Sequence, residues 1–277
     1  MRILQALIVT ALAVSAQTPD PRELVRQAFA QDENIFNSVQ DYTYTEHETR
    51  RSLDAKGKVT STEQETSEVL YLYGRQYSKL VAKDGKPLSP SEAKKEEAKA
   101  EREVNRRKRE ADRGNKDPDD TAARRRKAAR EIADAFDFRI VGTEDVAAGR
   151  GINAQTWLID ATPRRGYQAK TREAKLYAKT SGRLWINQAD HSLVKAKIRV
   201  DDTISFGYFL FRLAPGARVE FERTHLAANV WLPKHFFVKG EAKIGMVKTY
   251  RVEVEREYSD YKKFQTESTV TLGAAAP

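Results

Sequence analysis

The four histidines are the side chains in this chain best suited to metal binding or general acid–base catalysis. His47, His191, His225 and His235 form no HExxH pair or other short metal-ligand pattern, and the chain contains no cysteine that would complete a zinc site. His225 and His235 either face each other across a turn or bond separately to neighbouring strand residues. We therefore expect neither a metal centre nor histidine catalysis.

A glycine-rich segment also matches a cofactor motif, because Gly149–Ala154 reads G-x-G-x-x-A. It leads into the strand-like Gln155–Ala161, so no helix N-terminus would be present to hold a pyrophosphate. A turn between two strands is the better interpretation. The chain has no G-x-S-x-G elbow, and no carboxylate pair stands out from its surface charge. The sequence predicts a protein that is not an enzyme and holds no cofactor.

The N-terminus has the layout of a secretory signal peptide. Met1–Ala16 combines Arg2, an apolar run from Ile3 to Val14, and a small-residue end at Ala16. The run is shorter than the ~20 residues of a membrane-spanning helix, so we expect cleavage after Ala16. The alternative is a buried N-terminal helix. Because a signal peptide directs export, we expect a periplasmic protein, or a secreted one.

A basic segment interrupts the remaining sequence at about 91–136. Between Ser91 and Arg130 there are 15 basic and 10 acidic residues, which is a net +5 of the chain's +9. Ser91–Arg113 consists almost wholly of strong helix formers without an apolar stripe, which predicts a solvated helical arm. Thr121–Phe136 is predicted to be a second helix that docks through Ala129, Ile132, Ala133 and Phe136.

Alternating apolar and polar residues predict strands over most of the other segments. Pro21–Val39 has helical periodicity, with Asp20 as a cap, and is expected to precede a meander of antiparallel strands. The predicted strands are Asp41–Leu53, Val59–Tyr73, Gln76–Val81, Phe138–Val141, Gln155–Ala161, Glu173–Ala178, Arg183–Asn187, Leu193–Val200, Arg218–Leu226, Lys234–Glu241 and Lys248–Tyr258. The fold class is therefore mainly β, of the α+β type, with a charged helical insertion.

Several motifs after Asp41 carry a family resemblance. They are Phe138–Tyr167, the strand pair Gly182–Asn187 and Ser192–Ile198, Phe206-Gly207, Trp231-Leu232-Pro233 and Tyr258–Phe264. Together they resemble the LolA-like superfamily of outer-membrane lipoprotein-sorting proteins. The resemblance implies a curved, half-open antiparallel β-barrel with covering helices, spanning 17–268 and followed by a disordered tail at 269–277. It also implies that acyl chains of a lipid or lipoprotein bind in an apolar cavity.

Ile204–Leu213 is the most apolar window after the signal segment and does not alternate cleanly. It either lines the cavity or forms an ordinary buried strand, and Trp185 likewise lines a cavity or packs in the core or at the surface. The residues expected at the cavity are Phe206, Phe209, Leu210, Phe211, Trp185 and Trp231.

Two functions compete at this point. The first is a lipid or lipoprotein carrier or sensor in the cell envelope, without covalent chemistry. The second is an envelope-stress or assembly protein that binds a protein partner through the basic arm at 91–130. The arm could instead contact an anionic membrane surface or remain solvated. Because export separates the protein from the genome, nucleic acid is not expected as a partner.

Overall fold

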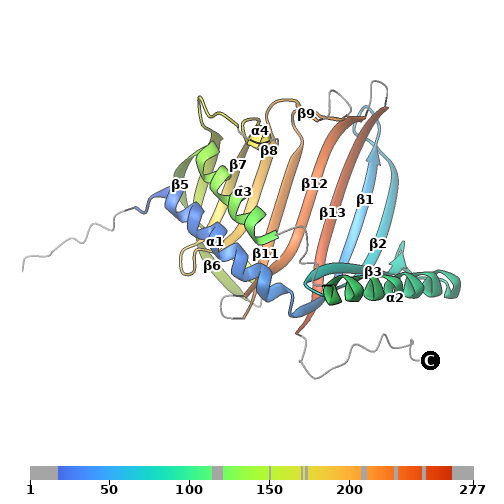
Figure 1. Ribbon diagram of the computed structural model, residues 1–277. Helices are drawn as coiled ribbons and strands as arrows, with labels where there is room; N and C mark the ends of the chain where they lie inside the picture. Colours follow the sequence, from blue (N-terminus) through green and yellow to red (C-terminus); the bar gives the residue numbers. More distant parts are fainter. Residues whose placement is uncertain are drawn as a thin grey trace, which may run out of the picture.

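The computed structural model consists mainly of one antiparallel sheet that is curved and open (Figure 1). It describes residues 18–113, 121–149, 151–169, 171, 174–206, 211–227, 230–244 and 248–263, except the side chains of 33, 34, 36, 121–125, 206 and 211. The predicted signal segment and the predicted tail lie outside these residues. The prediction of a mainly β fold with a half-open curved sheet and covering helices is confirmed.

The sheet has 13 strands, and its main path runs β4-β3-β2-β1-β13-β12-β11-β8-β7-β6-β5. The last strand, β13, therefore pairs with the first strand, β1, in the middle of the sheet. The strands are β1 Tyr42–Leu53, β2 Val59–Leu72, β3 Arg75–Lys83, β4 Lys86–Pro87, β5 Phe136–Gly149, β6 Ile152–Pro163, β7 Thr180–Asn187, β8 Leu193–Val200, β9 Ile204–Phe206, β10 Phe211–Leu213, β11 Arg218–Ala227, β12 Val230–Ile244 and β13 Lys248–Lys263.

Four helices accompany the sheet in the described part of the chain: α1 Pro21–Val39, α2 Pro90–Asp112, α3 Thr121–Ala135 and α4 Ala174–Tyr177. The Asp20 carboxylate accepts a hydrogen bond from the backbone N–H of Arg22, so the predicted cap of α1 is present. α2 starts with a capping box between Ser89 and Glu92. No helix among the described residues is long and apolar enough to cross a membrane.

Three segments differ from the sequence prediction. Ala174–Tyr177, predicted to be part of a strand, forms α4, and Ala174 is fully buried there. Phe136 does not end the second helix of the insertion but begins β5. β5 also continues to Gly149, well beyond the predicted end at Val141, because its backbone pairs with β6 along its length. Pairing with β6 outweighs weak local patterning along β5.

α1 packs along one face of the sheet, and the sheet curves around it. At its N-terminal end, Leu24 and Val25 join a cluster with Ile159 and Ile186 of β6 and β7. Its C-terminal residue Val39 packs instead with β1, β2 and β12, in a cluster that also holds Tyr42, Tyr44, Val69 and Leu232. One helix therefore contacts strands from both halves of the sheet, and we call the face that carries it the concave face.

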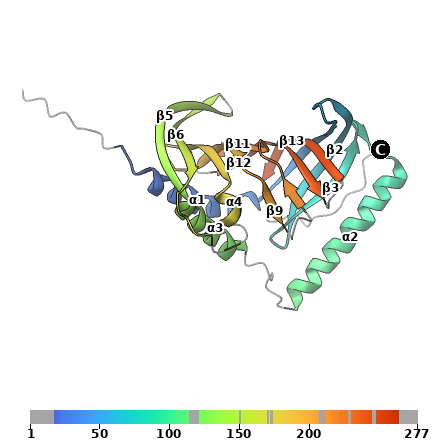
Figure 2. The same cartoon turned by 90° about the horizontal axis from the view of Figure 1, so that it is seen from above.

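α3 lies beside α1 over the strands β5–β8, whereas α2 lies across the other end of the sheet, near β3 (Figures 1 and 2). α2 is not wholly solvated, because Ala100 and Arg107 are buried. The Arg107 guanidinium donates hydrogen bonds to the backbone carbonyls of Leu72, Arg75 and Gln76, at 3.3, 2.6 and 3.1 Å. Arg107, together with an ion pair between Arg75 and Glu110 at 2.6 Å, thus joins the basic arm to the turn between β2 and β3.

Candidate functional site

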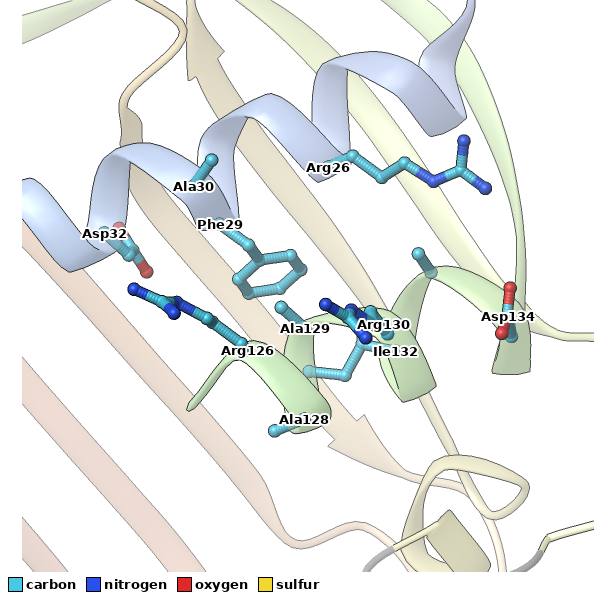
Figure 3. Close-up of a pocket in the computed structure, with 11 residues that line it drawn as sticks. Arg26, Phe29, Ala30, Asp32, Arg126, Ala128, Ala129, Arg130, Ile132 and Asp134 are labelled. Carbon is cyan, nitrogen blue, oxygen red and sulfur yellow. The ribbon is translucent and has the colours of Figure 1, made fainter. Parts of the chain in front are cut away.

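A groove of about 640 Å³ lies between α1 and α3 on the concave side of the sheet (Figure 3). Phe29 and Ala30 of α1 and four apolar residues of α3, Ala128, Ala129, Ile132 and Ala133, supply most of its surface. Its volume lies within the ~300–1,000 Å³ typical of small-molecule sites. The groove is thus an apolar site large enough for one small ligand or one acyl chain.

Arg22 fixes the two helices relative to each other. Its guanidinium donates hydrogen bonds to the carbonyl oxygens of Ala133 and Phe136, at 2.6 and 3.3 Å, where α3 ends. The Ala133 carbonyl is among the last four of α3, which have no partner within a helix, so a cation at this position satisfies it and opposes the negative end of the helix dipole. Arg22 also lies 3.8 Å from the Asp137 carboxylate. The groove therefore has a defined wall on both sides.

Charged side chains surround this apolar floor. Arg26 comes from α1, and Arg126 and Arg130 come from α3, where a spacing of four residues puts them on one face of the helix. In Figure 3 the Phe29 ring lies between the guanidinium groups of Arg126 and Arg130. The acidic residues lining the groove are Asp32 and Asp134. The rim of the groove therefore carries both basic and acidic side chains around an apolar floor.

A second cavity of about 500 Å³ adjoins the first and shares Arg126, Arg130 and Asp134 with it. Lys127, Glu131, Tyr167 and Gln168 complete its lining. The Glu131 carboxylate accepts a hydrogen bond from the Thr171 hydroxyl at 3.0 Å. Burial, together with the charges of Glu131 and Asp134, raises the pKa of Tyr167 above its usual range, so this tyrosine is a neutral hydrogen-bonding group at neutral pH.

Trp185 and Trp231, which the sequence predicted at a cavity, are both nearly fully buried and lie outside the α1–α3 groove. The indole N–H of Trp185 donates to Glu144 at 3.0 Å, and the Lys195 ammonium lies 5.3 Å from its ring centroid. Leu184 and Ile186, its neighbours in β7, pack with α1, so Trp185 is on the opposite face of the strand.

Trp231 belongs to a core cluster under α1 that also holds Ile35, Ala148 and Val194. Its indole N–H donates to Asp190 at 2.8 Å. Burial opposes ionisation of Asp190, but hydrogen bonds from Trp231, Ser192 and Asn187 outweigh burial and hold the pKa of this carboxyl below its usual range. Trp231 packs in the core and also lines a separate pocket of about 420 Å³, together with Ile152 and His225.

The other four predicted cavity residues belong to the β9–β10 segment. The backbones of Phe206 and Phe211 pair with each other, and β10 pairs with the end of β12. Phe209 and Leu210, and the side chains of Phe206 and Phe211, lie outside the described residues. Nearby, Ile204 packs with Val200 and Ala217 in a cluster of its own.

The predicted turn and histidine positions can be located directly. Gly149 and Gly151 have φ angles of +88° and +72° between β5 and β6, so the glycine-rich segment is a strand-to-strand turn, as predicted. His225 and His235 do not face each other, because His225 is opposite Trp231 and His235 is opposite Glu222. No group of three potential metal ligands occurs among the described His, Asp and Glu residues.

The concave face changes character at β13 and β1. Phe236 of β12 is opposite Arg256 of β13, which is opposite Glu48 of β1, so all three share this face. The Arg256 Nε lies 2.6 Å from Glu48 and 3.9 Å from Glu46. Burial opposes ionisation of Glu48, but Arg256 and Arg50 outweigh it and lower its pKa, whereas burial raises the pKa of Glu46.

Tyrosines continue this polar region toward the end of α1. Tyr44 stacks edge-on against Tyr258 and is tilted against Tyr261, with ring centroids 5.9 and 5.2 Å apart. Burial raises the pKa of Tyr258 to about 12 and that of Tyr44 further, so their hydroxyls are neutral at neutral pH. The Tyr261 hydroxyl donates to the Pro233 carbonyl. These contacts join β1 to the returning strands.

Sequence reasoning did not identify Arg26, Phe29, Arg126 and Arg130 as site residues. Local sequence carried part of the signal, because arginines four residues apart flank the apolar residues of α3. The missing information was that α1 lies beside α3, although the two helices are about a hundred residues apart.

No protein-family model matches the chain, and no curated protein matches it. Among solved structures, the chain is similar to a DUF1329 family protein from Desulfovibrio piger, with a TM-score of 0.34 and 12% sequence identity. That alignment covers 90% of this chain and 96% of the other. The fold and the groove therefore define the class of protein by themselves: an open, curved antiparallel sheet whose concave face is partly covered by helices.

Proposed function

We propose that the protein binds an acyl chain of a lipid or lipoprotein in the α1–α3 groove and performs no covalent chemistry. The observation that carries the proposal is the apolar floor formed by Phe29, Ala129, Ile132 and Ala133, inside a groove of about 640 Å³. Burial of an acyl chain contributes roughly 0.8 kcal/mol per methylene and demands no specific polar partner. Such a floor is therefore sufficient for binding.

The proposal includes the cellular setting that the sequence predicts. The signal-like segment Met1–Ala16 supports a location in the periplasm or outside the cell, where acyl chains need a protected route through water. The LolA-like resemblance favours a carrier or sensor of lipoproteins or lipids. The apolar Ile204–Leu213 segment remains a second proposed contributor to the binding surface, together with the groove.

The first test is native mass spectrometry of the protein purified from its own cell envelope. A bound mass that fragments to an acyl lipid or lipoprotein supports the proposal. The second test is calorimetric titration with hexadecanol below its aggregation concentration, because hexadecanol supplies an acyl-like chain without charge. Measurable binding of one chain per protein is the expected result.

A groove-filling variant locates the binding. Ala129→Trp places a large ring on the floor, and we expect hexadecanol affinity to fall at least tenfold. The matched control is Ala55→Trp, in the exposed turn between β1 and β2, which should leave affinity unchanged. Thermal melting of both variants shows whether the fold is retained. Equal affinity in a folded Ala129→Trp protein would remove the groove from the proposal.

A second candidate function is binding to an anionic membrane or to an envelope protein through α2. The observation that favours it is the buried Arg107, which orients α2 on the sheet and leaves Lys95, Arg102 and Lys108 exposed. Basic residues near an anionic membrane contribute about 1 kcal/mol each. Replacing these three with glutamine should therefore abolish flotation with anionic vesicles, and unchanged flotation would exclude the membrane as the partner of α2.

A further inference from the structure

A pocket of about 420 Å³ lies at the end of the sheet where the β5–β6, β7–β8 and β11–β12 connections come together. It shares no lining residue with the α1–α3 groove, so it is a separate site. Its volume falls within the ~300–1,000 Å³ typical of small-molecule sites. We call it the amide pocket, because four carboxamides line it together with two rings: Asn153, Gln155, Asn187, Gln188, His225 and Trp231.

The lining of the amide pocket is polar without being charged. Asp, Glu, Lys and Arg make up 32% of the chain, yet none of them is among the described residues that line this pocket. A carboxamide offers both N–H donors and a carbonyl acceptor, and a hydroxyl also donates and accepts. An ion would lose water here without gaining an opposite charge. The lining therefore favours a neutral ligand with several hydroxyl groups.

Hydrogen bonds in the surrounding turns hold the walls of the pocket in place. The Asn187 amide and the Trp231 indole both donate to the Asp190 carboxylate, at 2.7 and 2.8 Å. The backbone N–H of Gln188 donates to the Gln155 carbonyl at 2.9 Å, which joins the β7–β8 turn to β6. Because these bonds link three separate connections, the pocket has a defined shape before any ligand binds.

Three of the carboxamides remain available to a ligand. The side-chain amides of Asn153, Gln155 and Gln188 form no hydrogen bond within the part of the chain that the structure describes. Asn153 and Gln155 are two residues apart on β6 and are both exposed, so their side chains project from the same face of the strand. Water solvates such amides until the hydroxyl groups of a ligand replace it.

An aromatic surface completes the amide pocket. His225 is opposite Trp231 in the β11–β12 pairing, and the two ring centroids are 5.0 Å apart with the planes tilted by 59°. Trp231 is only 2% exposed, whereas His225 is partly exposed, so the imidazole presents more of its surface to the pocket. Ile152, which is 47% exposed, adds an apolar contact. These groups can cover the C–H face of a ring-shaped ligand.

We propose that the amide pocket binds a neutral saccharide unit. A sugar ring carries hydroxyl groups at its edge and C–H groups on its faces, so the carboxamides and the His225 ring match its two kinds of surface. A peptide is the weaker match, because proteins bind extended peptides mainly through main-chain hydrogen bonds, and this pocket offers side-chain amides instead. The proposal does not depend on acyl binding in the α1–α3 groove.

The test is a titration of the ¹⁵N-labelled mature chain, followed by NMR, with maltotriose, cellotriose and triacetylchitotriose. At least one of these neutral trisaccharides should shift the side-chain amide resonances of Asn153, Gln155 and Gln188 in a saturable way at millimolar concentration. The indole N–H of Trp231 should shift with them, whereas that of Trp185, outside the pocket, should not. Absence of saturable shifts with all three sugars overturns the proposal.

Two comparison ligands test the chemical class. Acetyl-trialanine amide supplies peptide groups without charge, and trigalacturonate supplies sugar rings with carboxylates. Both should bind at least fivefold more weakly than the best neutral trisaccharide. If the tripeptide shifts the same resonances with equal or higher affinity, the ligand class is a peptide and the proposal is overturned. Tighter binding of trigalacturonate than of every neutral sugar overturns the assignment of a neutral ligand.

Variants locate the binding. Gln188→Ala and Asn153→Ala each remove one hydrogen-bonding group and should weaken trisaccharide binding about fivefold. His225→Ala should weaken it by a similar factor, and His225→Phe, which keeps a ring, should lose less. Gln64→Ala, on an exposed position of β2 outside the pocket, is the control and should bind normally. Thermal melting shows which variants are folded.

The variants also separate this inference from the acyl-binding function. Unchanged affinity in folded Gln188→Ala and His225→Ala proteins would overturn the proposal, and so would an equal loss in Gln64→Ala. The groove-filling variant Ala129→Trp should bind the trisaccharide like the unsubstituted protein, because it alters no residue of the amide pocket. Loss of hexadecanol binding with normal trisaccharide binding in that variant is therefore the result expected for two independent sites.

Discussion

The two ends of the sheet are covered by helices in different ways. Over β6–β8, α1 buries Val25 and Ala28 against Ile159 and Ile186, so the contact is apolar and continuous. At the β3 end, α2 attaches through the polar contacts of Arg107. α1 is part of the hydrophobic core and contributes to folding, whereas the contacts of α2 position a charged helix on the sheet. A helix can therefore dock on this sheet without completing its core.

The strands between these ends explain why the sheet remains open. On the same concave face where β6 and β7 present isoleucines, β13 and β1 present Arg256 and Glu48. A face with paired charges and tyrosine hydroxyls needs no apolar cover, because its polar groups are satisfied by one another or by water. The groove lies between α1 and α3, on the face that carries the apolar residues of β6 and β7.

The largest effect is expected in the apolar cover. Ile186 is fully buried between α1 and the sheet, so Ile186→Ala should lower the free energy of unfolding by about 2–5 kcal/mol in urea denaturation. Ile198→Ala, on the neighbouring strand, removes the same atoms from a residue that is 40% exposed and should cost much less. Equal losses would contradict the distinction between covered and uncovered positions.

The next effect tests the attachment of α2. Arg107→Gln removes the hydrogen bonds to the β2–β3 turn, so hydrogen exchange within α2 should accelerate, corresponding to about 1–3 kcal/mol of local opening free energy. Global unfolding should change less, because the core over β6–β8 is untouched. Arg109→Gln is the control, since Arg109 is exposed and bonds within its own helix, to the Asn105 carbonyl. A similar acceleration in both variants would argue against a specific anchor.

A smaller effect is expected in the polar centre of the sheet. Arg256→Gln leaves Glu46 and Glu48 without their shared cation, and should destabilise the protein by about 1–2 kcal/mol. Arg199→Gln, where the side chain is 69% exposed, should change stability by only a few tenths.

Arg256→Gln should also change how the stability of the protein depends on acidic pH. The pKa of Glu48 is lowered in the folded protein, so its stabilisation is present above the unfolded pKa and is lost as pH falls through the folded value. In Arg256→Gln, the free energy of unfolding should therefore fall less steeply as the pH is lowered through this range. If the free energy of unfolding fell with acid as steeply as in the unsubstituted protein, the ion pair between Arg256 and Glu48 would be contradicted.

The smallest effect concerns Glu103 on α2. Hydrogen bonding to Arg106, opposed in part by burial and supported by Arg107, lowers the pKa of Glu103 to about 2 from 4.5. Because the folded pKa is depressed, this stabilisation is complete above about 4.5 and is lost as pH falls toward 2. Glu103→Gln should remove less than about 1 kcal/mol of this pH dependence. Hydrogen exchange within α2 across this window provides the measurement.

Local chemistry was enough to predict several elements closely. α1 spans Pro21–Val39 as predicted, because Asp20 caps it, Pro21 suits its first position and its apolar residues recur at helical spacing. β8 spans Leu193–Val200 as predicted, and the first three strands form the expected meander. For the strands the neighbouring element is also next in sequence, so the pattern and the contact carry the same information, whereas α1 is specified by its own capping and periodicity.

Only the tertiary structure decided the features that bring distant segments together. Strand patterns do not specify that β13 returns beside β1. Helix formers without an apolar stripe did not reveal that Arg107 is buried against backbone carbonyls. The groove itself requires α1 beside α3, with Arg22 holding the end of α3. Periodicity records which face of an element is apolar, whereas the partner of that face depends on packing across the whole chain.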